Sequence, residues 1–562
     1  MEQARLLIAI VLSLVVFLVW NYLFVEPQMP QQKDKQLRTH AQNLQGKTTQ
    51  KKPQKKSIQS DSIDDKNSIT NKINTLSEKE GGPNRTITVD NSIYTVKISE
   101  KGAGIISFVL KEYFENIKPD AKRKELLTQQ HNLNSLALFF ENKSLKDLDK
   151  AKFHAVTDND KIKIDNRNYQ LSFIKNTAEG IQIKKTFTFQ PDSYLIDLDV
   201  IIQNNSNNTL SDQLGLRLSN IREVSKNSSS YAFEGPSALI DGKLKQVKIK
   251  KDNPPDILKG KIQWIALEDR YFMTSLIAKE MQKSSMRIKI TPDKLLNEYI
   301  GPKIAVESGT SKHFKYAIFF GPKKQDLLKK LNYNLSQVIH FGFFDFLAKP
   351  FLWFLNFIYS IIPNYGVSII ILTILTKILL WPLGNKSYKS MNQMKRLQPL
   401  MQEIREKYKN DKTKMNQEMM GLYRTYKINP LGGCLPMIVQ IPVFFALYRM
   451  LYQAIELRHA PFIWWINDLS APDRLFHFNF SIPMMQPPYG IPVLTIIMGA
   501  SMLLQQKMSP PPGDPAQAKM MMIMPIVFTV IFINFSSGLV LYWLISNLLS
   551  IGQQYYIQKK YA

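Results

Sequence analysis

One charged side chain stands inside a long apolar stretch of this 562-residue sequence. Lys377 lies between Val367 and Trp381, among residues that are otherwise apolar apart from one serine and two threonines. A charge at the centre of a membrane helix costs about 2.5 to 3.5 kcal/mol on insertion scales and commonly marks a binding cavity or a transport pathway. Thr373, one turn earlier, would share the same helix face. The alternative is that the lysine, five residues before Pro382, extends its stem to the lipid headgroups.

Polar residues also interrupt the other apolar segments and could line a hydrated groove. They are Gln440, Gln505, Gln506, Asn534, Ser546 and Asn547. The sequence lacks the HExxH, GxxxxGK[ST], GxGxxG and GxSxG motifs, so the main enzyme classes that carry such motifs lose their support. Its one cysteine, Cys434, excludes a disulfide framework and a cysteine-based metal site. We therefore expect no enzyme, no cofactor and no metal.

Six apolar segments have the character of membrane helices. They are residues 6–24, 366–383, 434–454, 491–504, 520–535 and 539–557. The fourth and fifth contain only 14 and 16 residues, whereas a helix needs about 20 residues to cross a 30 Å hydrocarbon core. Short helices thin the bilayer around them. Such thinning would lower the barrier to moving a hydrophilic segment across.

Basic residues set the expected orientation of these helices. The loop 384–430 carries eleven lysines and arginines, whereas the loop 455–490 carries only Arg458 and Arg474. Positively charged short loops remain in the cytoplasm. The sequence therefore predicts a polytopic α-helical membrane protein with six spans, with both termini inside and a large domain outside. The formal charge of +27 also favours anionic partners such as phospholipid headgroups or RNA, and DNA is not an expected partner.

The N-terminal half has three parts by composition. Residues 1–27 are expected to form an uncleaved membrane anchor, although a cleaved signal peptide is the alternative. Residues 28–83 are rich in Gln, Lys, Asn, Ser and Thr, which favours a flexible linker. Residues 84–340 contain alternating apolar and polar positions with Asn-rich turns, which predicts a large antiparallel β-sandwich. Clear alternation occurs at Tyr94, Val96, Ile98; Ile181, Ile183, Phe187, Phe189; and Tyr194, Ile196, Leu198, Val200, Ile202.

Two further helical segments are expected outside the spans. Residues 341–363 are apolar but interrupted by polar residues and Pro350, which favours an amphipathic helix in the membrane interface over a seventh span. Residues 386–427 have helical periodicity on both sides of Asn410-Asp411, which predicts an antiparallel cytoplasmic hairpin, with Pro399 kinking its first arm or marking its start. Its basic residues either form a solvated face or dock RNA, anionic lipid or a targeting factor. The candidates for docking are Lys395, Arg396, Arg405 and Lys407.

Methionine is concentrated in the same part of the chain. Of the 22 methionines, 17 lie between residues 384 and 562. Flexible thioethers suit a surface that accepts many apolar partners, but they also fill gaps between packed membrane helices. Both interpretations remain open from the sequence.

Several blocks of sequence resemble the YidC/Oxa/Alb family of membrane protein insertases, in its long Gram-negative form. The strongest are Asn364-Tyr-Gly-Val-Ser-Ile-Ile, Trp381-Pro-Leu, Met394-Lys-Arg-Leu-Gln-Pro, Asn429-Pro-Leu-Gly-Gly-Cys-Leu-Pro, Gln440-Ile-Pro-Val-Phe-Phe-Ala-Leu-Tyr and Ser537-Gly-Leu-Val-Leu-Tyr-Trp-Leu-Ile-Ser-Asn. Matching blocks extend from about residue 322 to the end. Trp264 with Arg270-Tyr-Phe gives a weaker match in the outer domain.

The resemblance implies insertion of newly made proteins into the bacterial inner membrane, alone or beside the Sec translocon, through a hydrophilic groove. It also implies a periplasmic location for the outer domain and a ribosome or targeting factor as a further partner. Lys377 would be the positive groove residue, where the family more often has arginine. Thr373 and Trp543 match positions of substrate contact, Gln440 would belong to the groove, and Gln505 is a weaker candidate.

Two other functions are compatible with the same residues. A structural assembly factor for the translocon would share every feature except the need for a groove charge. A solute transporter or channel would use Lys377 as an anion site, although the sequence shows neither internal repeats nor rings of ligands.

Overall fold

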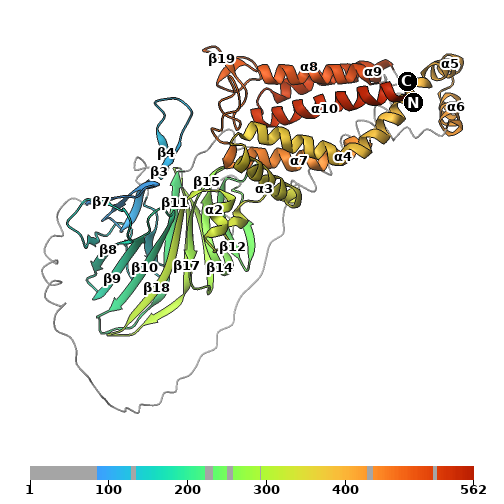
Figure 1. Cartoon of the computed structure of the whole chain (residues 1–562). Helices are drawn as coiled ribbons and strands as arrows, with labels where there is room; N and C mark the ends of the chain where they lie inside the picture. Colours follow the sequence, from blue (N-terminus) through green and yellow to red (C-terminus); the bar gives the residue numbers. More distant parts are fainter. Residues whose placement is uncertain are drawn as a thin grey trace, which may run out of the picture. The chain divides into compact units, whose positions relative to one another are not determined.

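The computed structural model describes residues 85–127, 134–221, 232–249, 257–291, 293–426, 435–509 and 515–561. The predicted anchor 1–27 and the whole of the predicted linker 28–83 lie outside these residues. A β-rich part covers residues 86–322, and a helical part covers residues 325–561 (Figure 1).

The β-rich part contains two sheets. The smaller has five strands in the order β4-β3-β2-β1-β7, and the larger has 13 strands. The strands are β1 (Thr86–Asp90), β2 (Tyr94–Ser99), β3 (Gly104–Phe114), β4 (Arg123–Leu127), β5 (Ala137–Phe140), β6 (His154–Ala155), β7 (Lys161–Lys163), β8 (Tyr169–Asn176), β9 (Ile181–Phe189), β10 (Leu195–Asn204), β11 (Leu210–Ile221), β12 (Gly235–Ile240), β13 (Lys243–Gln246), β14 (Leu258–Glu268), β15 (Phe272–Ala278), β16 (Lys283–Ile290), β17 (Lys294–Val306) and β18 (Ser311–Pro322).

Aromatic side chains join the two sheets. Phe108 on β3 lies 5.3 Å from Phe320 on β18 and 4.7 Å from Tyr94 on β2, measured between ring centroids. All three side chains are fully buried. The pairings are antiparallel, as predicted, with one exception among the described strands: β1 pairs with β7 in parallel.

The alternation of apolar residues locates the strands correctly but misses one core residue. In β9 every odd-numbered side chain from 181 to 189 is buried, and this set includes Lys185. Its ammonium donates to the carbonyls of Ala103 at 2.5 Å, Leu136 at 2.8 Å and Gly102 at 3.4 Å. Backbone carbonyls therefore replace the water that a buried lysine loses. Burial lowers the pKa of Lys185 to about 7.

The helical part contains two short 3-10 turns before α3. A loop with two short strands separates α7 from α8. The elements are α2 (Gln325–Lys330), η3 (Leu335–Val338), η4 (Gly342–Phe344), α3 (Asp345–Ile361), α4 (Tyr365–Arg396), α5 (Gln398–Lys407), α6 (Lys412–Thr425), α7 (Leu435–Gln453), η6 (Ile455–Leu457), β19 (Leu475–Phe478), β20 (Tyr489–Ile491), α8 (Val493–Met508), α9 (Pro515–Phe532) and α10 (Ser537–Tyr561).

Helix α4 is longer than the sequence predicts. It begins at Tyr365, where the Asn364 side chain accepts a hydrogen bond from the Val367 amide at 3.1 Å, which is an N-cap. It then continues through Pro382 to Arg396, so the predicted end of this span at residue 383 is not a helix end. The predicted hairpin start at 386 is therefore wrong, because these residues belong to α4.

The hairpin itself consists of the shorter helices α5 and α6. The helix breaks at Leu397, and Pro399 falls in the first turn of α5, where its missing N–H removes no helix hydrogen bond. The Asp411 carboxylate accepts from the amides of Thr413 and Lys414 and so caps α6. Asn410-Asp411 is thus the turn, as predicted.

Membrane-spanning character varies among the described helices. Helix α4 alone is both long and apolar enough to cross a membrane, while Val493–Met508 and Lys519–Phe532 are shorter apolar segments. Helices α8 and α9 have 16 and 18 residues, or about 24 and 27 Å at 1.5 Å per residue. They are therefore short for a 30 Å core, in line with the lengths expected from the sequence.

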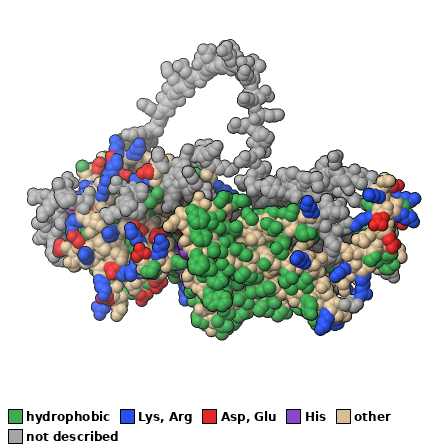
Figure 2. Space-filling view, turned by 90° about the horizontal axis from the view of Figure 1, so that it is seen from above, with side chains coloured by type: hydrophobic (Ala, Val, Ile, Leu, Met, Phe, Trp, Pro, Cys, Tyr) green, Lys and Arg blue, Asp and Glu red, His purple; other side chains and the backbone are tan. Residues whose placement is uncertain are grey.

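Apolar side chains are exposed across the helical part. They form a broad continuous face there, whereas charged side chains are interspersed over the β-rich part (Figure 2). In α3, which lies within the predicted interfacial segment, Ala348, Leu352, Leu355 and Ile358 are buried, while Phe346 and Trp353 are more than half exposed. This two-sided burial is typical of an amphipathic helix.

Candidate functional site

A polar seam runs between α4, α7 and α10. We use this name for Lys377, Gln440, Ser546 and Ser550. The Lys377 ammonium donates to the Ser550 hydroxyl at 2.8 Å, and Ser550 in turn donates to the Ser546 carbonyl at 2.8 Å. Gln440 donates from its side-chain amide to the Ser546 hydroxyl at 3.2 Å. The two serines are four residues apart and so share one face of α10.

The hydrogen bond from Lys377 to Ser550 favours a lysine within the seam over a snorkelling lysine. Lys377 is directed at α10, whereas its neighbours Ile378 and Leu379 are 61% and 79% exposed on the outer side of α4. The ammonium is thus held inside the helix bundle, with a hydroxyl as its acceptor. A partly buried cation with a neutral partner keeps an uncompensated positive charge, which attracts carboxylates and other hydrogen-bond acceptors.

Further polar contacts continue the seam toward the end of α10. Gln553 donates to the carbonyl of Trp381 at 3.1 Å and to the side-chain oxygen of Asn385 at 2.9 Å. A Cβ atom added at Gly384 would lie 2.7 Å from the Gln553 amide. A larger residue at 384 would therefore displace the end of the Gln553 side chain from this position. Asn547 donates to the Ser501 hydroxyl at 3.1 Å and ties α8 to the same helix.

Trp543 forms an aromatic wall beside the seam. It precedes Ser550 by seven residues, which is two helical turns, so both side chains lie on the same side of α10. Its ring centroid is 4.8 Å from that of Phe444 on α7 and 4.9 Å from that of Phe532 on α9. The wall therefore joins three helices and gives the seam an apolar flank.

The structure does not bring Thr373 into the seam. Its side chain is fully buried, and its hydroxyl donates to the Ile369 carbonyl at 2.6 Å within α4. Gln505 on α8 lies beside Tyr388, which also contacts Ser550. Gln505 is thus connected to the seam through one tyrosine. Sequence reasoning missed Ser550 and Tyr388, although the spacing of Ser546, Ser550 and Gln553 on an apolar helix is a usable signal.

The basic residues proposed for docking belong to two helices. Lys395 and Arg396 form the last turn of α4, whereas Arg405 and Lys407 end α5. Cations at helix C-termini are stabilised by the helix dipole. The ammonium of Lys407 also lies 5.6 Å from the centroid of the Tyr408 ring. All four side chains are at least partly exposed to solvent.

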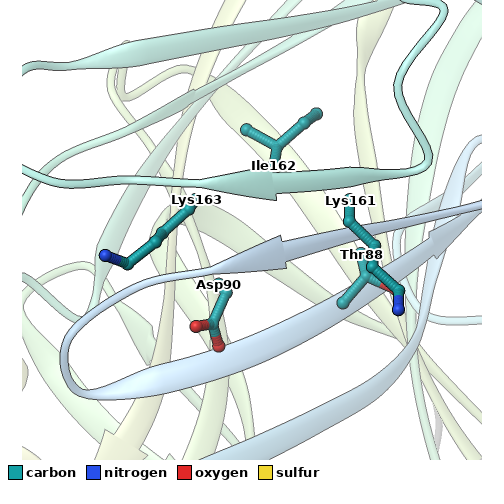
Figure 3. A pocket seen from close by; sticks show the side chains of 5 residues that line it. All are labelled: Thr88, Asp90, Lys161, Ile162 and Lys163. Atoms are coloured by element: carbon teal, nitrogen blue, oxygen red, sulfur yellow. The ribbon is translucent and has the colours of Figure 1, made fainter.

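A shallow depression lies apart from the seam, on the β-rich part. It has a volume of about 310 Å³ and is lined by Thr88, Asp90, Lys161, Ile162 and Lys163. Asp90 is already engaged by Lys111 at 2.9 Å and by Thr95 at 2.6 Å. The amines of Lys161 and Lys163 point to opposite ends of the depression (Figure 3). Its charged groups therefore do not converge on one point where a ligand could bind.

Comparisons with known proteins assign both parts of the chain. A family model described as "60Kd inner membrane protein" matches residues 357–562, and one described as "YidC periplasmic domain" matches residues 86–354. A membrane protein insertase YidC from Syntrophus aciditrophicus is 42% identical over 84% of this chain and 85% of its own length. The chain belongs to the YidC family of membrane protein insertases.

Another relative extends the similarity to almost the whole chain. A membrane protein insertase YidC from Pelobacter propionicus is 37% identical over 99% of both chains. The YidC family assignment thus rests on both halves of the sequence and confirms the resemblance seen in its motifs. It makes this chain an inner-membrane protein with a periplasmic β-rich domain.

Solved structures show weaker similarity. A crystal structure of an active YidC insertase has 18% identity and a TM-score of 0.37 and covers 85% of this chain and 93% of that one. A galactose mutarotase related enzyme from Lactobacillus acidophilus has 12% identity and a TM-score of 0.31, covering 42% of this chain and 97% of that one. These scores are too low to add to the YidC family assignment.

Proposed function

We propose that this chain inserts newly made membrane proteins into the bacterial inner membrane by receiving their hydrophilic segments at the polar seam. The observation that carries the proposal is the Lys377 ammonium, held 2.8 Å from the Ser550 hydroxyl between the helices of the bundle. A positive charge with only a neutral partner is poised to exchange that partner for an acceptor on the client. The lysine ammonium is a point charge, so it does not form the paired hydrogen bonds to both carboxylate oxygens that an arginine guanidinium forms.

The surroundings of Lys377 suit a transient site. The hydroxyls and amides of Ser546, Ser550 and Gln440 offer exchangeable hydrogen bonds, and Trp543 with Phe444 and Phe532 supplies an apolar flank. A hydrophilic segment can therefore replace contacts with water by contacts with the seam. The apolar segment of the client then leaves into lipid, because burial contributes about 25 cal/mol per Å² of apolar area. No nucleotide is needed.

The proposed arrangement has six spans, with both termini in the cytoplasm. It rests on the excess of basic residues in 384–430 over 455–490. Helix α3 then lies in the outer interface, and the β-rich part is periplasmic. The short helices α8 and α9 thin the bilayer next to the seam.

The partners follow from this orientation. Nascent inner-membrane proteins are the clients, with the Sec translocon beside them for clients that need it. The basic residues Lys395, Arg396, Arg405 and Lys407 face the cytoplasm and would contact a ribosome or a targeting factor through its anionic groups. Exposed Met520, Met522 and Met524 on α9 offer flexible apolar contacts to unrelated client helices.

Site-specific photo-crosslinking tests the proposal without removing the charge at residue 377. A photoreactive residue at 440 should crosslink to the hydrophilic N-terminal segment of a ribosome-stalled single-span client, within a narrow window of nascent-chain lengths. The matched control is the same probe at Leu379, which lies two residues from Lys377 and is 79% exposed on the outer side of α4. Equal crosslinking from both positions, or none from 440 at any length, would contradict the seam as the receiving site.

Two alternative functions predict different results. A structural assembly factor would leave client crosslinks at 440 absent while the Sec translocon still co-purifies. A transporter would show saturable flux of a small anion in proteoliposomes without any client, and an insertase would not.

A further inference from the structure

The loop between α7 and α8 displays large apolar side chains to solvent. The exposed fractions are 82% for Trp464, 67% for Phe476, 64% for Phe480 and 73% for Met484. Single exposed apolar residues are common on protein surfaces, but several large ones on the same loop indicate a contact surface.

The loop holds three of these residues in an unfavourable backbone conformation. Trp464, Phe476 and Met484 have positive φ angles of 52°, 51° and 65°. This left-handed region is rarely occupied by bulky residues and is costly unless the surroundings require it. Exposure and an unfavourable backbone therefore occur at the same side chains, which is unexpected for a loop that merely connects two helices.

A polar framework holds part of the loop against the end of α9. Arg474 is only 7% exposed and donates to the carbonyls of Pro488 at 2.9 Å and Ile533 at 2.8 Å. Asn534 donates to the Met484 carbonyl at 2.8 Å and accepts from the Gln486 amide at 2.8 Å. The framework consequently ties the loop to the end of α9 and presents its apolar tips in fixed positions.

The framework continues into the start of α8. Asp473 accepts from the Trp465 indole at 2.6 Å and from the Leu494 amide at 2.5 Å. A carboxylate at a helix N-terminus is stabilised by the free amides and the helix dipole. Asp473 therefore ties the loop to the first turn of α8.

The chemistry of the loop indicates what covers it. From Leu475 to Val493 the sequence contains no Asp, Glu, Lys or Arg. The next residues with exposed side chains on α8 are Ile496 and Ile497, at 51% and 45%. The apolar loop surface is thus continuous with the apolar surface of a membrane helix. The opposite end of α8 carries Lys507 in its last turn, so the two ends differ in character as the outer and inner sides of a membrane do.

We propose that this loop is a lipid anchor that inserts Trp464, Phe476, Phe480 and Met484 into the headgroup and acyl boundary of the outer leaflet. Aromatic side chains are favoured at this depth because their rings are apolar while the headgroup region remains polar. The anchor fixes the depth of α8, whose 16 residues are too few to set it by spanning the bilayer. This inference rests on the membrane orientation proposed above, and the test separates the two.

Depth-dependent fluorescence quenching in lipid nanodiscs tests the anchor in the full chain. The only cysteine, Cys434, is replaced by serine, and single cysteines labelled with the environment-sensitive fluorophore NBD are placed by Phe476→Cys and Phe480→Cys. Lipids with a spin label near the glycerol end of the acyl chain should roughly halve the NBD emission at both sites. Lipids labelled near the terminal methyl group should quench it less.

Two control sites provide the signals expected for a dye in water and for a dye deep in the bilayer. Met281→Cys lies on the β-rich part at 58% exposure and should remain unquenched, with the emission of a dye in water. Ile523→Cys lies at the middle of α9 at 49% exposure and should be quenched most by the deep spin label. If Ile523 is quenched but 476 and 480 behave like 281, the anchor is overturned and the proposed function stands. If Ile523 is not quenched, the proposed placement of α9 in the bilayer, on which the proposed function depends, fails.

A protein partner on the loop is the remaining alternative. Emission from 476 and 480 that is shifted to the blue in nanodiscs but insensitive to either spin label would mean coverage by another protein surface, such as a second copy of this chain. That result also overturns the lipid anchor. Elution as one symmetric peak in size-exclusion chromatography establishes that each labelled variant is folded.

Discussion

Each of the two parts of the molecule contains a lysine that is at least partly buried. The two lysines differ in their burial and in their hydrogen-bond partners. In the β-rich part, Lys185 is fully buried, and three backbone carbonyls accept from its amine. In the helical part, Lys377 is partly exposed and donates to the hydroxyl of Ser550, in a seam whose other members also carry side-chain hydrogen-bonding groups. Fixed backbone acceptors close the first site to any ligand. In the proposed function, the second site retains a charge that a client can reach.

The different surroundings explain the different roles. Strand β9 lies in the interior of a sheet packed against a second sheet, where water is absent and every donor must have a permanent acceptor. Helix α4 has one side against α10 and the other outward, with Leu379 exposed. A half-open position permits rearrangement of hydrogen bonds at low cost. The same residue type therefore stabilises the fold in one part and is available for binding in the other.

The substitution Lys185→Met tests the closed site and should have the largest effect. Methionine fills the space but leaves the carbonyls of Ala103 and Leu136 without the amine donor. Because each unsatisfied buried group costs about 1 to 3 kcal/mol, we expect the opening free energy of β9 to fall by about 3 kcal/mol. Hydrogen exchange of peptides from Ile181–Phe189 in the full chain measures this opening free energy. Lys184→Met, on the opposite face of the strand, is the control and should change it little.

The stability of β9 should also depend on pH. The pKa of Lys185 is lowered to about 7 by burial, whereas an unfolded lysine has a pKa of about 10.4. Between these values the unfolded chain binds more protons than the folded chain, so the opening free energy should rise with pH from 7 to about 9.5. The slope is at most about 1.4 kcal/mol per pH unit.

Hydrogen exchange at several pH values, corrected for intrinsic rates, measures this dependence. Lys185→Met should abolish the slope. A flat profile in the unmodified chain would mean instead that the three carbonyls keep the ammonium charged throughout this range.

The substitution Lys377→Glu tests the open site. Reversal of the charge repels acidic client segments, and like charges at close range cost several kcal/mol. We expect at least about a tenfold loss in the rate of client insertion into proteoliposomes, with Lys377→Arg retaining most activity because the charge is kept. Unchanged insertion by the glutamate variant, with normal protein levels in the membrane, would favour the assembly-factor alternative.

The substitution Ser550→Ala should have the smallest effect. It removes the acceptor of Lys377, and a hydrogen bond of this kind contributes about 1 kcal/mol net, so we expect the insertion rate to fall by at most about fivefold. Leu548→Ala, at an exposed position two residues away on α10, is the matched control. A loss as large as that of Lys377→Glu would show that Ser550 binds the client itself rather than holding the lysine.

Local patterns in the sequence were sufficient to predict much of this architecture. The alternation in 94–98 and 181–189 locates β2 and β9, and the apolar runs locate α7 and α10 within a few residues. These features are recoverable because periodicity and hydrophobicity are properties of neighbouring residues. Lys185 was missed for the same reason, since a lysine between Ile183 and Phe187 breaks the apolar pattern even though its side chain lies in the core.

Helix boundaries around proline were less predictable. Pro382 suggests a helix end, yet α4 continues past it to Arg396. Packing against α10, including the contact of Gln553 with Trp381 and Asn385, holds this segment in place. Proline inside a membrane helix is tolerated when neighbouring helices stabilise the backbone. That stabilisation comes from residues about 170 positions away in the chain, which no local pattern reveals.

Residue types and their order are enough to show that a charge at Lys377 interrupts an apolar segment, that the loop 384–430 is strongly basic and that the chain resembles YidC insertases. The hydrogen-bond partner of Lys377 became evident only from the tertiary structure. It selects Ser550 on α10 and leaves the Thr373 hydroxyl bonded within α4. The physical reason is that the side chain's acceptor depends on how α4 and α10 pack, and packing joins positions that are distant in sequence.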